Sequence, residues 1–288
     1  MQKIFVKAYG KINLGLDVLR KREDGYHDLK MVMQNVGIYD GIEIKRVKKE
    51  GIHIKCNVKS VPTDESNLVY KAAKLLMDEF NIIDGLDISI EKVIPVAAGM
   101  AGGSSDCAAT LIGINRMFNI GLSEAGLRER GVKLGADVPY CIMGGTALAE
   151  GIGEKLTKLP DAPDCKVLLV KPPIDVSTGF VYGNLKLDEN SNHPDIEKIL
   201  DAIENNDYEG MSANIGNILE SVTIKGYPII EEIKQDMLEL GADNSLMSGS
   251  GPTVFGLFSN EDNIAKAYKV LNIKYPDAQI YITDFAKR

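Results

Sequence analysis

Hydrophobic and polar residues alternate along most of the first part of the chain. Residues 3–19, 29–35, 41–46 and 51–56 each show a period of two, which is typical of strands that bury one face. After residue 66 the period changes, and apolar residues recur at helical spacing. We therefore predict a group of strands followed by a helix whose apolar side belongs to the core.

A second strand-to-helix passage encloses a loop of small residues. Residues 86–93 alternate like a strand, and residues 107–118 have the Ala, Leu, Ile and Met content of a helix. The loop between them reads Pro95, Val96, Ala97, Ala98, Gly99, Met100, Ala101, Gly102, Gly103, Ser104 and Ser105. Small residues let backbone N–H groups close on phosphate oxygens, and a helix start adds unpaired donors and the positive end of its dipole. The pattern therefore predicts a phosphate site.

Two familiar nucleotide-binding motifs do not fit this loop. There is no G-x-x-x-x-G-K-[ST], because serines stand where the lysine belongs, and the glycines lack the G-x-G-x-x-G spacing of dinucleotide-binding enzymes. The simpler alternative is an ordinary loop in which Ser104 caps the helix. We favour the phosphate site because the proline, the glycines and the serine pair occur together.

A third segment of interest follows a helix predicted for residues 123–134. Pro139 disfavours a helical conformation at Val138, so Asp137 is expected at a constrained turn. An aspartate in a turn often caps its own backbone, and that local role is the alternative to a chemical one.

The second half of the chain has the pattern of a separate α+β domain. A short proline-broken segment at 159–164 predicts a boundary, which gives domains 1–160 and 161–288. The elements after it are strands at 167–170, 244–247, 253–258 and 279–283 and helices at 227–240 and 260–274. Their order is typical of a ferredoxin-like domain.

Composition and charge exclude several classes of function. The net charge is −8, with 22 Lys and Arg against 20 Asp and Glu in residues 1–160, and 11 against 21 in residues 161–288. An acidic chain without basic clusters predicts no nucleic-acid partner, and no apolar run approaches the length of a membrane span. The four cysteines are scattered, which favours free thiols. We expect a cytoplasmic protein without a membrane partner.

Taken together, five motifs resemble the GHMP kinases, the family of galactokinase, homoserine kinase and mevalonate kinase. They are Lys11 to Leu14, Asp24 to His27, Pro95 to Asp106, Leu134 to Pro139 and Ser248 to Thr253. The resemblance spans nearly the whole chain. It implies an α+β, two-domain fold, with a domain like ribosomal protein S5 domain 2 first and a ferredoxin-like domain second.

The resemblance also implies a reaction, in which ATP is the co-substrate and an alcohol accepts the phosphoryl group. Lys11 and Asp137 are then the catalytic pair, and the loop 95–105 holds the ATP phosphates with Mg²⁺ near Ser104 and Ser105. Asn67 and Lys92 lie near the adenine, by the same resemblance. Without it, Asn67 is simply a helix-start residue.

The match is strongest to the family members that act on a cytidyl substrate, because Tyr26 and His27 directly follow the Asp24-Gly25 turn. The residues implied to bind that substrate are Asn13, Tyr26, His27, Thr178 and Tyr182, and the third-motif loop contributes Gly249, Ser250 and Gly251. Each has a simpler alternative. Lys11 and Asn13 share one strand face that solvent would cover, and Tyr26 is a half-buried loop aromatic with His27 as its polar neighbour. Thr178 and Tyr182 are a helix cap and a core aromatic, and the third-motif loop is a tight hairpin.

One departure from the family concerns the middle of the phosphate loop. Met100-Ala101 stands where the family commonly has Leu-Gly. Because a positive φ is strained for alanine, we expect residue 101 to take an ordinary conformation. Two alternatives remain open: a kinase for another alcohol such as homoserine or mevalonate, or a nucleotide-binding regulator without turnover. The protein is expected to be a monomer or a homodimer.

Overall fold

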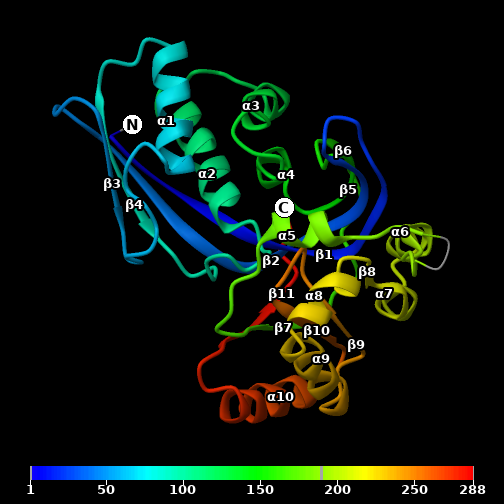
Figure 1. Cartoon of the computed structure of the whole chain (residues 1–288). Coiled ribbons are helices and arrows are strands. Elements are labelled where there is room, and N and C mark those ends of the chain that lie inside the picture. The colour runs from blue at the N-terminus through cyan, green and yellow to red at the C-terminus, as the bar shows by residue number, and fades with distance from the viewer. Residues whose placement is uncertain (1, 189–190, 288) are drawn as a thin grey trace. The chain divides into compact units, whose positions relative to one another are not determined.

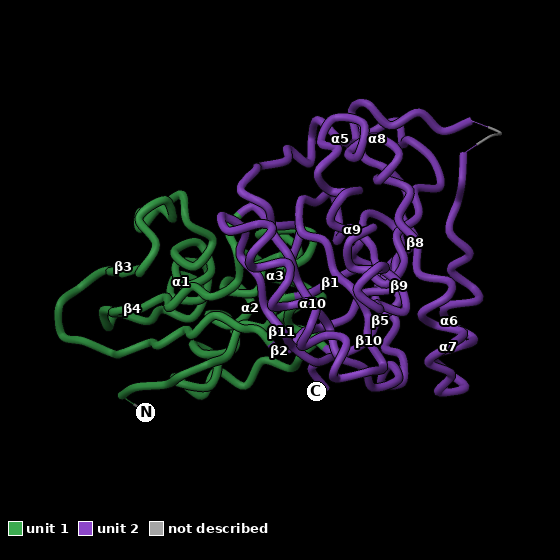
Figure 2. The backbone as a smooth tube through the Cα atoms, turned by 90° about the horizontal axis from the view of Figure 1, so that it is seen from below, with its two compact units in different colours: residues 1–10, 38–96, 101–144 green, residues 11–37, 97–100, 145–288 purple. Residues whose placement is uncertain are grey.

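The computed structural model describes residues 2–188 and 191–287. Its chain forms two compact units, one of residues 1–10, 38–96 and 101–144 and the other of residues 11–37, 97–100 and 145–288 (Figure 2). Two long strands, β1 (Lys3–Lys21) and β2 (His27–Val47), contribute residues to both units. Each compact unit is therefore built from several separate stretches of the chain and not from one half of it. The division into domains 1–160 and 161–288 stays a prediction.

The first unit is a mixed sheet with helices. β2 pairs antiparallel with β4 (Gly85–Glu91), and β4 pairs parallel with β3 (Ile52–Cys56) (Figure 1). The predicted strands 29–35 and 41–46 are one continuous strand in the structure. The helices of this unit are α1 (Leu68–Glu79), α2 (Gly102–Met117), α3 (Glu124–Gly131) and α4 (Val138–Met143).

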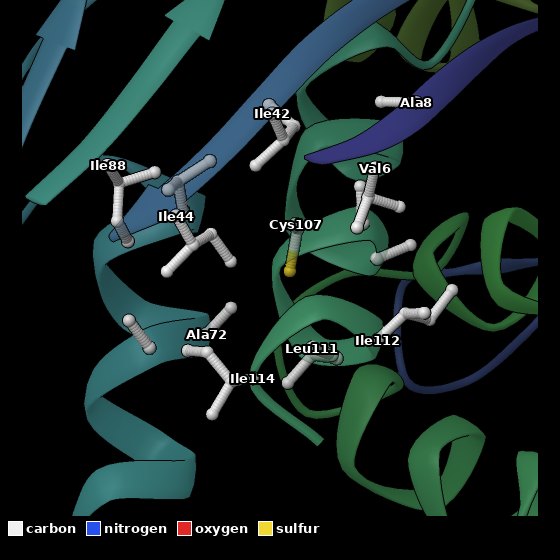
Figure 3. Close-up of a cluster of buried hydrophobic side chains, with 14 of the residues drawn as sticks. Val6, Ala8, Ile42, Ile44, Ala72, Ile88, Cys107, Leu111, Ile112 and Ile114 are labelled. Atoms are coloured by element: carbon white, nitrogen blue, oxygen red, sulfur yellow. The ribbon is translucent and has the colours of Figure 1, made fainter. Parts of the chain in front are cut away.

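The core of the first unit lies between its strands and the helix pair α1 and α2 (Figure 3). Alternate strand residues such as Ile42, Ile44 and Ile88 point to the helices, which present Ala72 and Leu111. All five are buried, and burying a large aliphatic side chain contributes about 1.5–3 kcal/mol. The period-two and helical patterns of the sequence therefore meet in one core.

The second unit contains a four-stranded antiparallel sheet in the order β11-β7-β10-β9. Its strands are β7 (Lys166–Lys171), β9 (Asn244–Met247), β10 (Val254–Phe258) and β11 (Gln279–Asp284). The helices α9 (Ile229–Glu239) and α10 (Glu261–Lys274) pack on it. Numbered within the domain, this is the order 4-1-3-2 of the ferredoxin-like fold, so that prediction is confirmed.

In the rest of the second unit, short strands pair with residues 11–21 of β1 and residues 27–37 of β2. Strand β5 (Thr146–Gly151) pairs with β2 and with β6 (Lys155–Lys158), and β8 (Gly216–Asn217) pairs with β1. The short helices here are α5 (Thr178–Asn184), α6 (Ile196–Glu204), α7 (Tyr208–Asn214) and α8 (Glu220–Gly226).

Two helix predictions need correction. The helix predicted for 123–134 ends at Gly131, and Ser123 caps its start by accepting a hydrogen bond from Gly126 N–H. The expectation that Pro139 keeps Val138 out of a helix is wrong, since α4 begins at Val138. Proline is tolerated in a first turn because its missing N–H has no intrahelical partner there. Within the described residues no helix combines the length and the apolar character needed to cross a membrane.

Candidate active site

The small-residue loop between β4 and α2 has an unusual backbone. Ala97, Gly99 and Ala101 have φ values of 53°, 71° and 55°, so left-handed residues alternate along the loop. The expectation of an ordinary conformation at residue 101 is therefore wrong. Two backbone bonds constrain this end of the loop: Lys11 N–H donates to Met100 O at 3.1 Å, and Ser105 N–H donates to Ala101 O at 2.9 Å. Tertiary and helix-start bonds thus impose a conformation that alanine disfavours.

This strain predicts that Ala101→Gly stabilises the protein. A left-handed conformation costs a non-glycine residue about 1–2 kcal/mol, and glycine loses roughly 0.5–1 kcal/mol more backbone entropy than alanine. We expect the free energy of unfolding in urea to rise by about 0.5–1 kcal/mol. The matched control is Ala98→Gly, at a residue without positive φ, which should lower it. A loss of stability in both variants would contradict the strain argument.

Helix α2 begins at Gly102, two residues before the first serine. The proposed capping role of Ser104 is therefore wrong: the N-cap is Ala101, and no side chain caps the helix there. Ser105 is buried, and its hydroxyl donates to Tyr9 O at 2.6 Å. The first-turn N–H groups of α2 are consequently left without a side-chain cap, as a phosphate site requires.

Gly99 contacts the third-motif loop, residues 248–251, within the second unit. A Cβ at Gly99 would lie 2.3 Å from Ser248 O and 3.0 Å from Gly251 O. Ser248 Oγ also donates to Gly99 O at 3.1 Å. The third-motif loop is a tight turn between β9 and β10, as the simpler alternative had it, and the same turn packs against the phosphate loop.

Lys11 extends from β1 to the same carbonyl. Its Nζ donates to Gly99 O at 3.0 Å and to Asn13 Oδ1 at 2.7 Å, and both side chains are at most 5% exposed. The prediction that Lys11 and Asn13 share one strand face is confirmed, and the solvent-covered alternative is wrong. Lys11 and Asp137 belong to different compact units, so their pairing stays a prediction.

Asp137 stands at the first position before α4. Its backbone O accepts from Cys141 N–H at 3.0 Å, whereas its side chain accepts no capping hydrogen bond from that helix. The local capping alternative is therefore excluded for α4. The side chain is half-buried, and a chemical role for Asp137 stays a prediction.

Lys92 lies in a buried cluster with two carboxylates. Its ammonium contacts Asp40 Oδ2 at 2.5 Å and Asp106 Oδ2 at 2.9 Å, and the side chain is 5% exposed. Asp40 Oδ1 also accepts the N–H groups of Val93 (2.6 Å) and Ile94 (2.8 Å). The cluster therefore joins the end of β4 to the first turns of α2. A contact of Lys92 with adenine stays a prediction.

Burial raises the pKa of Asp106 to about 7, although Lys92 opposes the shift. The ordinary pKa of the carboxyl is 3.8, so between about pH 4 and pH 7 the folded state holds a proton that the unfolded chain has lost. The free energy of unfolding must then fall as pH rises through this range. Burial is the main reason the proton is retained, and the second carboxylate, Asp40, adds to it.

We therefore expect Asp106→Asn to flatten the pH dependence of stability. The variant leaves one ammonium and one carboxylate, a balanced pair. Urea unfolding at pH 5 and pH 8 should show that the wild type loses roughly 1–3 kcal/mol more than the variant over this range. Equal losses in the two proteins would mean that Asp106 is ionised throughout.

Two residues of the predicted substrate set lie together in the second unit. The rings of His27 and Tyr182 have centroids 5.2 Å apart at an interplanar angle of 38°. Tyr26, the residue before His27, is 60% exposed. Burial, with a smaller effect of the Lys21 charge, lowers the pKa of His27. A neutral imidazole that donates and accepts is the form suited to a pyrimidine edge.

The alternatives for Thr178 and Tyr182 are wrong. The cap of α5 is Ser177, which accepts from Phe180 N–H, and Tyr182 is only half-buried. The Thr178 hydroxyl instead lies 2.8 Å from Ser250 Oγ in the third-motif loop. For Asn67 the simpler role is present: its side chain caps α1 by accepting from Val69 N–H at 2.8 Å.

Comparison with known proteins identifies the group to which this geometry belongs. A model of the N-terminal domain of the GHMP kinases matches residues 67–145, and a model of their C-terminal domain matches residues 192–277. The chain belongs to the GHMP kinase family. The resemblance inferred from the motifs is thereby confirmed, and the two-domain GHMP kinase fold with it.

Relatives within the GHMP kinases align along almost their whole length. The 4-diphosphocytidyl-2-C-methyl-D-erythritol kinase of Lachnoclostridium phytofermentans is 55% identical over 99% of this chain and 98% of the relative. The protein of that name from Clostridium perfringens is 50% identical over 96% of each chain. A solved structure of a 4-(cytidine 5'-diphospho)-2C-methyl-D-erythritol kinase has a TM-score of 0.85, with 30% identity over 99% of this chain and 100% of that one. A homoserine kinase from Cytophaga hutchinsonii, 18% identical over 99% of this chain and 95% of that one, shares the fold with a TM-score of 0.81.

A GHMP kinase uses ATP, and its nucleotide implies Mg²⁺. In the described part of the chain no group of three or more His, Cys, Asp and Glu is arranged to hold a metal ion. Mg²⁺ on nucleotide phosphates keeps several waters and needs only one or two protein ligands. Hydroxyl oxygens in the first turn of α2 fit that small requirement, and Ser104 is the better placed, because Ser105 is buried with its hydroxyl against Tyr9 O.

Sequence reasoning missed three side chains that hold segments together, two within the first unit and one within the second. They are Asp40, Asp106 and Asn217, all buried and polar. Asp106 directly follows the serine pair, so its position next to the phosphate loop could have indicated its importance. Asp40 and Asn217 sit in segments with no motif, and only their contacts in the fold reveal them.

Proposed function

We propose that this chain is a 4-diphosphocytidyl-2-C-methyl-D-erythritol kinase, which phosphorylates the 2-hydroxyl of its substrate in the non-mevalonate isoprenoid pathway. Family membership supports phosphoryl transfer from ATP to a small molecule. The observation that favours a cytidyl substrate is the approach of His27 and Tyr182 beside exposed Tyr26. Stacking on aromatic rings contributes about 1–3 kcal/mol per base, enough to select a nucleotide-bearing alcohol.

The phosphate loop and the start of α2 hold the ATP phosphates in this proposal. The alternating left-handed residues 97, 99 and 101 direct backbone N–H groups toward an anion, and the uncapped first turn of α2 adds more donors. Ser104 would contribute a hydroxyl to Mg²⁺, which neutralises charge on the phosphates when bound. Asn67 and Lys92 would contact the adenine.

Catalysis rests on Lys11 and Asp137. The substrate hydroxyl oxygen forms a bond to the γ-phosphorus while the bond to the β-phosphate oxygen breaks, and ADP leaves. Asp137 orients the hydroxyl and accepts its proton, and the Lys11 ammonium stabilises the developing alkoxide charge. The buried socket of Lys11, formed by Asn13 Oδ1 and Gly99 O, supports this role because it fixes where the charge lies.

The remaining roles complete the proposal. Tyr26 stacks on the cytosine, His27 hydrogen-bonds its edge, and Thr178 and Tyr182 contact the cytidine. Asn13 binds the substrate next to Lys11, and Gly249, Ser250 and Gly251 close on the phosphate loop. The protein acts in the cytoplasm on two small molecules, as a monomer or homodimer, and has neither a nucleic-acid nor a membrane partner.

A coupled ADP-release assay tests the proposal directly. The purified protein is incubated with Mg-ATP and, separately, with 4-diphosphocytidyl-2-C-methyl-D-erythritol, homoserine and mevalonate. We expect turnover only with the cytidyl alcohol. Turnover with homoserine or mevalonate would assign another reaction to the family site. Mg-ATP binding by calorimetry without turnover of any alcohol would indicate a regulator.

A further inference from the structure

Asn217 in β8 has a buried side chain whose two amide donors both serve a distant segment of the chain. It is 8% exposed, and its Nδ2 donates to Met247 O at 2.8 Å and to Gly249 O at 2.7 Å. Its Oδ1 accepts Leu219 N–H at 3.0 Å. Both amide donors are thus used on the two carbonyls that flank Ser248, at the start of the third-motif loop.

The backbone of Asn217 is tied to the strand that carries Lys11. β8 pairs parallel with β1, so that Gly216 is opposite Gly15 and Asn217 is opposite Leu16. Ile218 N–H also donates to Leu16 O at 3.0 Å. The side chain therefore connects the catalytic strand and the third-motif loop within the second unit.

The third-motif loop shares its acceptor with Lys11. Gly99 O accepts from both Ser248 Oγ (3.1 Å) and Lys11 Nζ (3.0 Å). A Cβ at Gly249 would lie 3.1 Å from Gly99 O and 3.4 Å from Lys11 Nζ. Movement of the peptide units around Ser248 must therefore change the surroundings of the Lys11 ammonium.

We propose that Asn217 is a positioning residue for phosphoryl transfer, which sets the Lys11 ammonium by holding the third-motif loop against Gly99. The inference rests on the proposed function, because it assigns Lys11 its role in the reaction. Charge stabilisation by Lys11 matters most in the transition state. Loss of the Asn217 donors should consequently lower kcat much more than it changes KM for either substrate.

The variant Asn217→Asp separates this role from a purely structural one. It keeps the side-chain shape and the oxygen that accepts Leu219 N–H, but it replaces two donors by an oxygen facing two carbonyls. Burial and the facing acceptors raise the pKa of such a carboxyl. At lower pH the carboxyl is protonated and regains one donor, so activity should recover as pH falls.

The experiment measures kcat, both KM values and thermal unfolding for wild type, Asn217→Asp and Asn217→Ala. At pH 8 we expect kcat of Asn217→Asp to be about 10- to 100-fold lower than that of wild type, which is the size of effect that the loss of one catalytic interaction produces. Both KM values should change by less than about threefold. Its kcat relative to wild type should rise between pH 8 and pH 6. A crystal structure of Asn217→Asp at pH 8 should lack the hydrogen bond from Ser248 to Gly99.

A matched control is available in α2. Asn115 makes the same kind of amide contact, donating to Leu122 O at 2.9 Å and accepting Leu122 N–H at 3.0 Å. It lies near the C-terminal end of α2, away from the phosphate loop and about 20 Å along the helix axis from Gly102. Asn115→Asp should keep wild-type kcat at both pH values.

Several results would overturn the positioning role. A folded Asn217→Asp with wild-type kcat would do so, as would a loss of kcat that is independent of pH or accompanied by an equal rise in KM. If wild type turns over homoserine or mevalonate instead of the cytidyl alcohol, the proposed function fails, and the same comparison is made with the alcohol that is used. An unfolded Asn217→Ala leaves the decision to the aspartate variant.

Discussion

Asp137→Asn is expected to lower kcat for ADP release by roughly 10²–10⁴-fold, the usual contribution of a positioned proton acceptor. The amide keeps the shape of the side chain, but it cannot accept the proton and carries no charge. Because the Asp137 side chain makes no capping hydrogen bond to α4, the variant should unfold at the wild-type urea concentration. Steady-state kinetics and urea unfolding on the same preparation check both expectations.

The control for this variant is Asp78→Asn in α1. Asp78 is an exposed aspartate of the same unit that pairs with Lys74 on the helix surface. The same loss of one charge there should leave kcat unchanged. Near wild-type turnover in a folded Asp137→Asn would remove Asp137 from the mechanism and leave Lys11 with the phosphate loop as the catalytic elements.

Gly99→Ala is expected to abolish most activity and to destabilise the protein. A Cβ there would lie 2.3 Å from Ser248 O, a backbone atom that cannot turn aside, and φ is +71°. The third-motif loop and the phosphate loop must separate, which disturbs the carbonyl that Lys11 and Ser248 share. We expect kcat/KM to fall at least 10²-fold and the free energy of unfolding to fall by roughly 2–4 kcal/mol.

Gly226→Ala in α8 controls for the effect of replacing a glycine by an alanine as such. No heavy atom lies within 4 Å of a Cβ at Gly226, and its φ is not in the left-handed region. The control should retain activity and lose no stability. If Gly99→Ala behaves like Gly226→Ala, the close packing of the two loops does not occur in solution, and the argument for Asn217 loses its basis as well.

Local pattern was sufficient for most of the elements. The period of two along β1 and the helical spacing of α1 follow from which faces are buried, and both survive in the fold because burial is what the pattern records. The local pattern determined the ends of the elements less well. Whether 29–35 and 41–46 are one strand depends on pairing with β4 and β5, which are distant in sequence.

The chemistry of the site divides in the same way. The phosphate loop is visible in the sequence because its small residues have a local physical meaning, whereas the roles of Lys11 with Asn13 and of Tyr26 with His27 were suggested only by resemblance to the family. The conformation of Ala101 was not visible, since one tertiary and one helix-start backbone bond override the preference of alanine. The approach of His27 to Tyr182 was suggested only by resemblance to the family.

The sequence by itself determined the kinds of element, the phosphate loop and the kinase family. Only the tertiary structure decided which contacts hold the segments in place. Asp40 pairs with Lys92, Ser248 donates a hydrogen bond to Gly99 O, and Asn217 donates hydrogen bonds to the third-motif loop. The physical reason is that a buried polar group must find its hydrogen-bond partner wherever the fold brings one. Such partners are chosen by the packing of segments far apart in the chain, and no local pattern encodes them.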